Sequence, residues 1–247
     1  MVNEPKTRVF IAKGRRANVY LEGNYAIKVY EPSYPTYAIY DEIKMSQYLC
    51  RITDLPIPLM FPGDRPNEIK MDYLEGETLE TKMRRRGEES FEEFVPTQLS
   101  INSYTNLDLP SLHDRYARIL TDTSKIDAKT KGKLLTLLSS IERKTNLCHM
   151  DYHVMNVMVV KEKYYIIDWV NCGIGNPIFD VARTYLLLDY QSNKVSQSYL
   201  LKYCKLSKIK KEEVLRVLPL LAALRLEETE DANENVYLKN IIANIGE

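Results

Sequence analysis

The sequence has no excess of charge of either sign, because its 247 residues carry 34 Lys and Arg against 34 Asp and Glu. A zero balance removes the simplest electrostatic argument for a protein that binds nucleic acid or a membrane surface. Long apolar runs are also missing. The longest candidate, 217-VLPLLAAL-224, is too short to span a bilayer and is interrupted by Pro219. We therefore expect neither a nucleic-acid partner nor a membrane partner.

Cysteine is scarce as well, with four residues that lie far apart and have no framework spacing. They are Cys50, Cys148, Cys172 and Cys204. Scattered cysteines of this kind indicate free thiols in a reducing compartment. The first residues, 1-MVNEPKTRVF-10, lack the basic and then apolar pattern of a signal peptide. These features predict a cytoplasmic protein.

Strand-like segments crowd the first third of the chain. Runs rich in β-formers occupy 8–13, 18–22, 25–30 and 68–73, and Gly23-Asn24 between the second and third runs is a hairpin signal. Segment 37–52 carries apolar residues at near-helical spacing and ends before Pro56, which predicts a helix. We expect a loop over the proline-rich segment 56–66 and a turn over 75–78.

Helical patterns fill most of the remainder of the chain. They run from about residue 91 to 146, with loops at 102–110 and 121–127, and again from Phe179 onwards. Between them, residues 157–160, 161–163 and 164–168 predict strand, turn and strand, so that Asp168 ends the second strand. This order predicts an α+β fold, with a small β-rich lobe (1–72) joined to a larger helical lobe (73–247).

The segment 148-CHMDYHVMNVMVV-160 holds two of the three histidines of the chain and admits three interpretations. A zinc site would need a helix to point His149 and His153 the same way, and the ligand-pair spacings of known zinc motifs are missing. A polar connection that enters a hairpin is the ordinary alternative. The third is a catalytic loop.

Spacing favours the catalytic loop. The order His149-x-Asp151-x-x-x-x-Asn156 is typical of kinase catalytic loops, and Asp168 follows in the second strand of the predicted hairpin. There the first aspartate accepts the proton of the attacking hydroxyl. The asparagine and the second aspartate hold Mg²⁺ against the nucleotide phosphates.

A kinase also needs a lysine on an N-terminal strand and a glutamate on the following helix. Ala26 and Lys28 share one strand face, because strand side chains alternate. Glu42 lies fourteen residues after Lys28 on the predicted helix, whereas its neighbour Asp41 is the poorer candidate. An exposed strand lysine is the alternative for Lys28 considered alone. Because the predicted catalytic loop accompanies Lys28 in the same chain, we expect Lys28 and Glu42 to form an ion pair.

At this point the chain resembles a known family, the aminoglycoside phosphotransferase and choline kinase group. The similar segments are 149-HMDYHVMN-156, 168-DW-169, 177-PIFDVA-182 and 71-MDYLEGETL-79. The resemblance spans the chain from about Ile11 to the final helices. It implies a bilobal protein-kinase-like fold, a nucleotide-binding N-terminal lobe, and ATP- and Mg²⁺-dependent phosphorylation of a small-molecule hydroxyl.

The resemblance also implies roles for single residues. Asp151 would be the catalytic base between His149 and His153, the second histidine of that family's loop. Asn156 and Asp168 would bind Mg²⁺. In the nucleotide site, Lys28 with Glu42 would contact the α- and β-phosphates beside Ala26, and Asp72 and Leu74 would meet adenine through backbone groups beside Met71. Asp180 would buttress the catalytic loop.

Two positions depart from the family's pattern. Met150 stands where the family usually has glycine, so space beside the catalytic loop is tighter. The loop expected to cover the phosphates, 12-AKGRRANV-19, keeps only Gly14. A loop with one glycine is stiffer, and its amides approach the phosphates less closely. These departures motivate the alternative of a catalytically silent nucleotide-binding module.

The segment that follows Asp168 indicates which class of acceptor to expect. Only eleven residues separate Asp168 from Asp180, which leaves no room for a long phosphorylated activation segment. A small-molecule acceptor is therefore favoured over a protein, and an atypical protein kinase is the rival. The acidic run 227-EETEDANE-234 would suit a cationic amino sugar or amino alcohol. A solvated acidic helix face is at least as good an explanation of that run.

Overall fold

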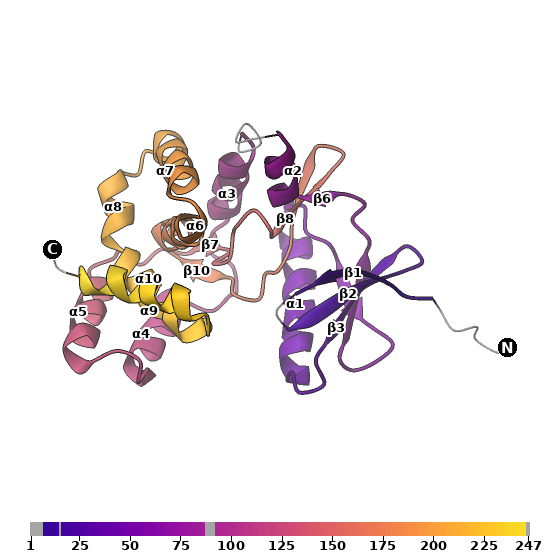
Figure 1. The fold of residues 1–247 in the computed structure, drawn as a ribbon, viewed down its shortest axis with the longest axis horizontal. Helices are drawn as coiled ribbons and strands as arrows, with labels where there is room; N and C mark the ends of the chain where they lie inside the picture. Colours follow the sequence, from indigo (N-terminus) through magenta and orange to yellow (C-terminus); the bar gives the residue numbers. More distant parts are fainter. Residues whose placement is uncertain (1–6, 15, 87–91, 246–247) are drawn as a thin grey trace. The chain divides into compact units, whose positions relative to one another are not determined.

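The computed structural model describes residues 7–14, 16–86 and 92–245 (Figure 1). The chain divides into two compact units, one of Met1–Arg85 with Val154–Val170 and the other of Arg86–His153 with Asn171–Glu247. The first unit therefore takes in residues beyond 72, the position after which we divided the sequence into lobes. Within the described ranges, no helix combines the length and the apolar character that crossing a bilayer requires.

A five-stranded antiparallel sheet in the order β1-β2-β3-β5-β4 forms the base of the first unit. Its strands are β1 (Val9–Lys13), β2 (Ala17–Glu22), β3 (Tyr25–Tyr30), β4 (Met60–Pro62) and β5 (Glu68–Asp72). The predicted β2–β3 hairpin is confirmed, since Glu22 pairs with Tyr25 across the turn. Gly23 has a φ of 60°, which glycine adopts without strain.

Strand β4 corrects the prediction of a loop over 56–66. It lies at the edge of the sheet, where Pro62 is tolerated because an edge strand leaves one side of its backbone unpaired. Its pairing with β5 depends on a partner strand that begins after the proline-rich segment. A local composition rich in proline therefore concealed the strand.

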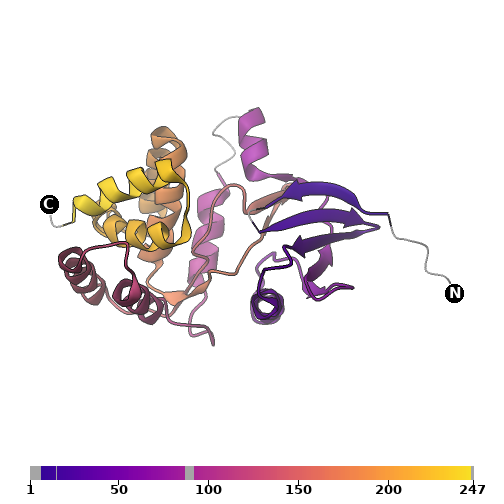
Figure 2. The same cartoon turned by 60° about the horizontal axis from the view of Figure 1, so that its bottom comes forward.

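Helix α1 (Thr36–Ile52) lies along one face of this sheet, as Figure 2 shows. The predicted helix over 37–52 is confirmed. Ile39 and Ile43, one turn apart, are both buried in a core with residues of the sheet. Burial of each such side chain contributes about 1.5–3 kcal/mol to stability. The core fixes the helix against the sheet, and Glu42 is buried on the same helix.

A second sheet of the first unit has the order β6-β8-β9. It comprises β6 (Glu77–Thr78), β8 (Val157–Val160) and β9 (Lys163–Ile166), and helix α2 (Leu79–Arg86) follows β6. The predicted β8–β9 hairpin is confirmed. Its two turn residues, Lys161 and Glu162, have φ values of 48° and 65°, as the tightest hairpin turn requires. The prediction was wrong in extending the second strand to Asp168 and in assigning Glu77–Thr78 to a turn.

Helices dominate the second unit, as predicted (Figure 1). They are α3 (Phe94–Ser103), α4 (Leu112–Asp122), α5 (Ala128–Ser139), α6 (Pro177–Gln191), α7 (Asn193–Ser207), α8 (Lys211–Arg216), α9 (Leu218–Glu228) and α10 (Ala232–Ala243). Helix α6 is the central one, because it packs against α7, α8 and α9 and buries most of its side chains. Asn176 caps its first turn and Pro177 occupies its first position, where a missing N–H costs nothing.

Two short strands, β7 (Asn146–Cys148) and β10 (Gly173–Gly175), pair antiparallel in the second unit. The prediction that helix continues to residue 146 was wrong, because α5 ends at Ser139. These strands are three residues long, too short to show an alternating pattern. Strand β7 leads directly into the segment that we interpreted as a catalytic loop.

Candidate active site

Strand β3 and helix α1 bring Lys28 and Glu42 together in the first unit. The Lys28 ammonium donates a hydrogen bond of 2.7 Å to Oε1 of Glu42. Burial alone would lower the pKa of Lys28, but the carboxylates of Glu42 and Asp168 outweigh it and raise that pKa above its ordinary value. The lysine is therefore a permanent cation, held by one carboxylate and near a second.

The hairpin β8–β9 positions the two predicted metal ligands in the same unit. Val157 pairs with Ile166, and the N–H of Ile167 donates to the carbonyl of Asn156 at 3.0 Å. Asn156 and Asp168 thus flank the open end of one hairpin, twelve residues apart in sequence but joined across the strands. The carboxylate and carboxamide oxygens at these positions are hard donors of the kind that Mg²⁺ prefers.

Asp168 lies two residues beyond the end of β9 and has a left-handed backbone, with a φ of 65°. For a residue other than glycine this conformation costs about 1–3 kcal/mol, and such residues cluster at functional sites. The carboxylate therefore lies where the ladder of the hairpin has ended. A sequence pattern of alternating residues gives no sign of that break.

The remaining predicted nucleotide residues surround β5 and the first turn. Ala26 pairs with Met71 across β3 and β5, which places these two residues side by side in the sheet. Asp72 ends β5, and the half-buried Leu74 follows two residues later. In the turn from β1 to β2, the N–H of Gly14 donates to the carbonyl of Ala17 at 2.8 Å.

In the second unit, the segment that we predicted to be a catalytic loop begins where β7 ends. Met150 has a φ of 64°, so the position where the resembled family usually has glycine adopts a left-handed backbone. The N–H of Met150 donates to Oδ1 of Asp180 at 2.8 Å, and Oδ2 of Asp180 accepts from Asn102 at 2.9 Å. The predicted buttress, Asp180, thus contacts the loop directly from α6.

Asp151 is flanked by both predicted histidines. Its backbone N–H donates to Nδ1 of His149 at 3.2 Å, and its carboxylate lies 3.7 Å from Nε2 of His153. Burial alone would raise the pKa of Asp151, but the hydrogen bond and charge of His153 and the charge of Arg183 lower it below its ordinary value. The Asp151 carboxylate is therefore ionised and accepts hydrogen bonds at neutral pH.

Two residues near the predicted groups were not expected from the sequence. Tyr30 on β3 donates its hydroxyl hydrogen to Oε2 of Glu42. The alternation of strand side chains, which relates Ala26 to Lys28, would have pointed to it. Arg183 on α6 is buried and paired with Glu228, and no sequence signal places its charge near Asp151.

The structure thus groups the predicted residues into two sets. The first unit holds the larger set: Gly14, Ala26, Lys28, Glu42, Met71, Asp72, Leu74, Asn156 and Asp168. The second unit holds His149, Asp151 and His153. Among the described residues, no group of three or more His, Cys, Asp or Glu side chains converges as a metal cage would.

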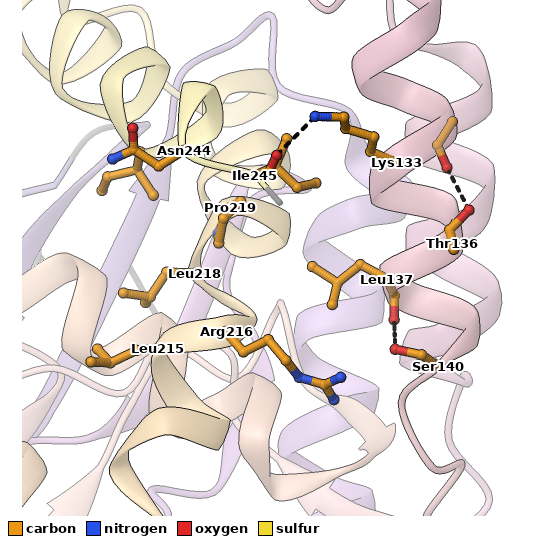
Figure 3. Close-up of a pocket in the computed structure, with 12 residues that line it drawn as sticks. Lys133, Thr136, Leu137, Ser140, Leu215, Arg216, Leu218, Pro219, Asn244 and Ile245 are labelled. Atoms are coloured by element: carbon orange, nitrogen blue, oxygen red, sulfur yellow. Dashed lines mark hydrogen bonds between the residues drawn. The ribbon is translucent and has the colours of Figure 1, made fainter. Parts of the chain in front are cut away.

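A cavity of about 1020 Å³ in the second unit holds none of the predicted residues. Figure 3 shows Thr136 and Leu137 of α5 on one side, with Leu218 and Pro219 of α9 across from them. The described residues that line it include no carboxylate, imidazole or thiol. The described lining residues therefore offer the hydroxyls of Thr136 and Ser140 no carboxylate or imidazole that could activate them as nucleophiles.

The sequence profile of the Phosphotransferase enzyme family (APH) matches residues 7–218, and the chain belongs to this family. No curated protein matches the chain. The predicted resemblance and the predicted fold class are confirmed.

Solved structures with the same fold include aminoglycoside phosphotransferases. A thermostable mutant of APH(4)-Ia in ternary complex with AMP-PNP and hygromycin B has a TM-score of 0.70 and 13% identity, covering 96% of this chain and 92% of that chain. The streptomycin–ATP–APH(2")-IIa ternary complex has a TM-score of 0.64 and 14% identity, covering 96% and 90%. A choline/ethanolamine kinase family protein from Mesorhizobium loti has a TM-score of 0.59 and 14% identity, covering 97% and 88%.

Proposed function

We propose that the protein transfers the γ-phosphate of ATP, with Mg²⁺, to a hydroxyl group of a small molecule. The observation that carries this proposal is the arrangement in the first unit, where Glu42 holds the Lys28 ammonium and the charge of Asp168 reaches it. A permanently charged lysine beside a carboxylate is the pairing that positions nucleotide phosphates in kinases. Catalysis of phosphoryl transfer is mainly positioning and charge stabilisation, which these groups supply.

Mg²⁺ fits the donor set of Asn156 and Asp168. Mg²⁺ is usually bound through one or two protein oxygens together with phosphates and water, so two protein ligands are enough. When bound, the ion neutralises charge on the phosphates. Ala26, Met71, Asp72 and Leu74 would line the adenine side, and the turn at Gly14 would cover the phosphates.

Asp151 would accept a hydrogen bond from the acceptor hydroxyl and then its proton. Its lowered pKa suits orientation of the hydroxyl in a loose transition state, where the proton leaves late. His153 would keep the carboxylate charged, and His149 would hold the backbone at Asp151. The acidity of Asp151 makes it a weak base on its own, so positioning carries more of the proposed role than basicity.

The acidic run 227–234 gives limited support to a cationic acceptor. Glu228 pairs with Arg183 and Arg225, and Glu234 accepts from Arg225 and Thr229. Two arginines thus offset two of the five acids. The hydrogen bonds to Glu234 stabilise the start of α10 rather than exposing a free carboxylate. We therefore propose an amino sugar or amino alcohol as the first class to test and neutral polyols as the second.

A panel of amino sugars, amino alcohols and neutral polyols, each with ATP or GTP and Mg²⁺, tests the proposal by acceptor-dependent ADP or GDP release. We expect release with at least one small acceptor and its loss in Asp151→Asn. Transfer of labelled phosphate to generic proteins alone would instead support an atypical protein kinase. Tight ATP·Mg²⁺ binding with no release across the panel would support a catalytically silent nucleotide-binding module. A cytoplasmic location, where ATP is abundant, is part of the same proposal.

A further inference from the structure

Tyr30 has no assigned role in the proposed function. It follows Lys28 by two residues on β3, so both side chains point to the same face of the sheet. The Tyr30 ring belongs to the core that joins the sheet to α1, and it stacks on Tyr34 with ring centroids 4.5 Å apart. Its ring therefore has a packing role. The hydroxyl has a separate contact.

The hydroxyl of Tyr30 donates to Oε2 of Glu42, while Lys28 donates to Oε1. Each oxygen of the carboxylate thus has its own donor. The Lys28 ammonium also lies 5.1 Å from the centroid of the Tyr30 ring, within the range of a cation–π contact. Three side chains contact one another pairwise, and the carboxylate at their centre is held in one orientation.

This arrangement needs Tyr30 to remain a hydrogen-bond donor. Burial raises the pKa of Tyr30, and the Glu42 carboxylate raises it further, whereas Lys28 acts in the opposite direction. The phenol is therefore protonated across the whole physiological range. A buried carboxylate oxygen that loses its donor is costly, so the Glu42 side chain would reorient if the hydroxyl were absent.

We infer that Tyr30 is a positioning residue that fixes the Glu42 carboxylate, and that Glu42 in turn presents the Lys28 ammonium to the nucleotide phosphates in a single orientation. The inference rests on the proposed function for its nucleotide and on the structure for its geometry. Tyr30 would contact neither substrate nor phosphate. Its hydrogen bond to Glu42 would keep the Lys28–Glu42 pair formed at all times, whereas many kinases form the corresponding pair only on activation.

Tyr30→Phe tests the inference, because it keeps the ring and removes only the hydroxyl. Tyr34→Phe is the matched control, since Tyr34 stacks on the same ring without a hydrogen bond to Glu42. The first measurement uses the free protein: the rate at which an amine-reactive ester acylates Lys28, followed by mass spectrometry. We expect Tyr30→Phe to raise that rate about tenfold, the order expected when one hydrogen bond to a charged group is lost. Tyr34→Phe should leave it unchanged.

The second measurement is the dissociation constant of ATP·Mg²⁺ by calorimetry in a double-mutant cycle with Glu42→Gln. We expect Tyr30→Phe to weaken binding several-fold in the native background and by much less in Glu42→Gln, because the hydroxyl acts through that carboxylate. A role in packing alone would give equal effects in both backgrounds, and would overturn the inference.

An unchanged or slower acylation of Lys28 in Tyr30→Phe would also overturn it, whatever the binding data show. Failure of the proposed function has a different signature. If the native protein binds no nucleotide while Tyr30→Phe still exposes Lys28, the proposed function is wrong and the positioning of Lys28 by Tyr30 stands.

Discussion

The two sets of predicted residues are supported by the fold in different ways. In the first unit, Lys28 and Glu42 contact each other directly and come from adjacent elements, fourteen residues apart. In the second unit, the loop around Asp151 is held by side chains far away in sequence. The carboxylate of Asp180 accepts a hydrogen bond from the N–H of Met150 and another from the side-chain amide of Asn102, which lies 78 residues before Asp180.

The side chains that support the predicted catalytic loop are themselves buried. Asn102 donates to the carbonyl of Leu147 as well as to Asp180, and its oxygen accepts from Tyr203. These groups form one buried network around the residues that precede Asp151. A network of this kind is costly to break, because each lost partner leaves another group unsatisfied. We therefore expect substitutions in the first unit to affect binding, and substitutions in the network of the second unit to affect stability as well.

The largest effect is expected for Asp151→Asn, which removes the proposed proton acceptor and keeps the shape of the side chain. The rate of phosphoryl transfer should fall by about 10²–10⁴-fold, with ATP binding nearly unchanged. Single-turnover kinetics and calorimetry measure the two quantities separately. Asp122→Asn, at the exposed end of α4, is the control and should behave as the native protein. Retained turnover in Asp151→Asn would remove Asp151 from its proposed role.

Asp168→Ala tests the first unit, as Asp151→Asn tests the second. It removes one proposed Mg²⁺ ligand, so Mg²⁺ should no longer tighten nucleotide binding, whereas the melting temperature should change little. Calorimetry with and without Mg²⁺ measures the effect. Asp64→Ala, an exposed carboxylate of the same unit, should keep the full Mg²⁺ dependence. An equal Mg²⁺ response in Asp168→Ala and the native protein would contradict the assignment.

Asp180→Ala tests whether the second unit depends on its buried network. The substitution leaves the N–H of Met150 and the amide of Asn102 without their shared acceptor, which should cost about 2–4 kcal/mol of unfolding free energy. Urea denaturation followed by circular dichroism provides the measurement.

The control for this change is Asp114→Ala, which removes an exposed pair with Arg143. Exposed pairs contribute little to stability because water and salt screen them, so this variant should stay near the native stability. Equal losses in Asp180→Ala and Asp114→Ala would show that the buried network does not support the loop more than a surface pair does.

A pH dependence follows from the lowered pKa of Asp151. A carboxyl whose pKa is lower in the folded state than in the unfolded chain stabilises the fold above the unfolded pKa, about 3.9. That contribution is lost as the pH falls through the folded pKa. The stability difference between the native protein and Asp151→Asn should therefore be constant near neutral pH and shrink below about pH 4. A difference that grows on acidification would contradict the lowered pKa.

The first unit was more predictable from the sequence than the second because its contacts follow local rules. Alternation along β3 relates Ala26 to Lys28, and a short link to the next helix brings Glu42 within reach. Gly23-Asn24 marks the hairpin, and its turn has the expected left-handed residue. The same alternation extends to Tyr30. Its contact with Glu42 could have been predicted from that rule together with the position of α1.

In the second unit, the sequence predicted the motif around Asp151 but not the side chains that hold this loop in place. The spacing of His149 and Asp151 relative to Asn156 of the first unit indicated the loop, but nothing local links Asn102 or Tyr203 to it. Their hydrogen bonds join positions 101 residues apart, and only the packing of α3 against α7 brings them together. Short strands such as β7 and β10 were missed because three residues carry too little pattern.

The smallest expected effect concerns Met150, where the left-handed backbone can be separated from side-chain burial. Met150→Ala and Met150→Gly both remove the buried side chain, but only glycine adopts a φ of 64° without strain. Glycine also costs more chain entropy on folding, by about 0.5–1 kcal/mol, which offsets part of the relief. Since left-handed strain costs about 1–3 kcal/mol, Met150→Gly should be more stable than Met150→Ala by about 1 kcal/mol.

Chemical denaturation of the two variants under identical conditions measures this difference directly, because the lost burial is common to both. Kinetics of the same pair shows whether strain at Met150 matters for the neighbouring Asp151. If the backbone at this position is set by Asp180 through the Met150 N–H, both variants should keep the same rate of phosphoryl transfer. A stability of Met150→Ala equal to or above that of Met150→Gly would mean that the left-handed backbone at residue 150 carries no strain.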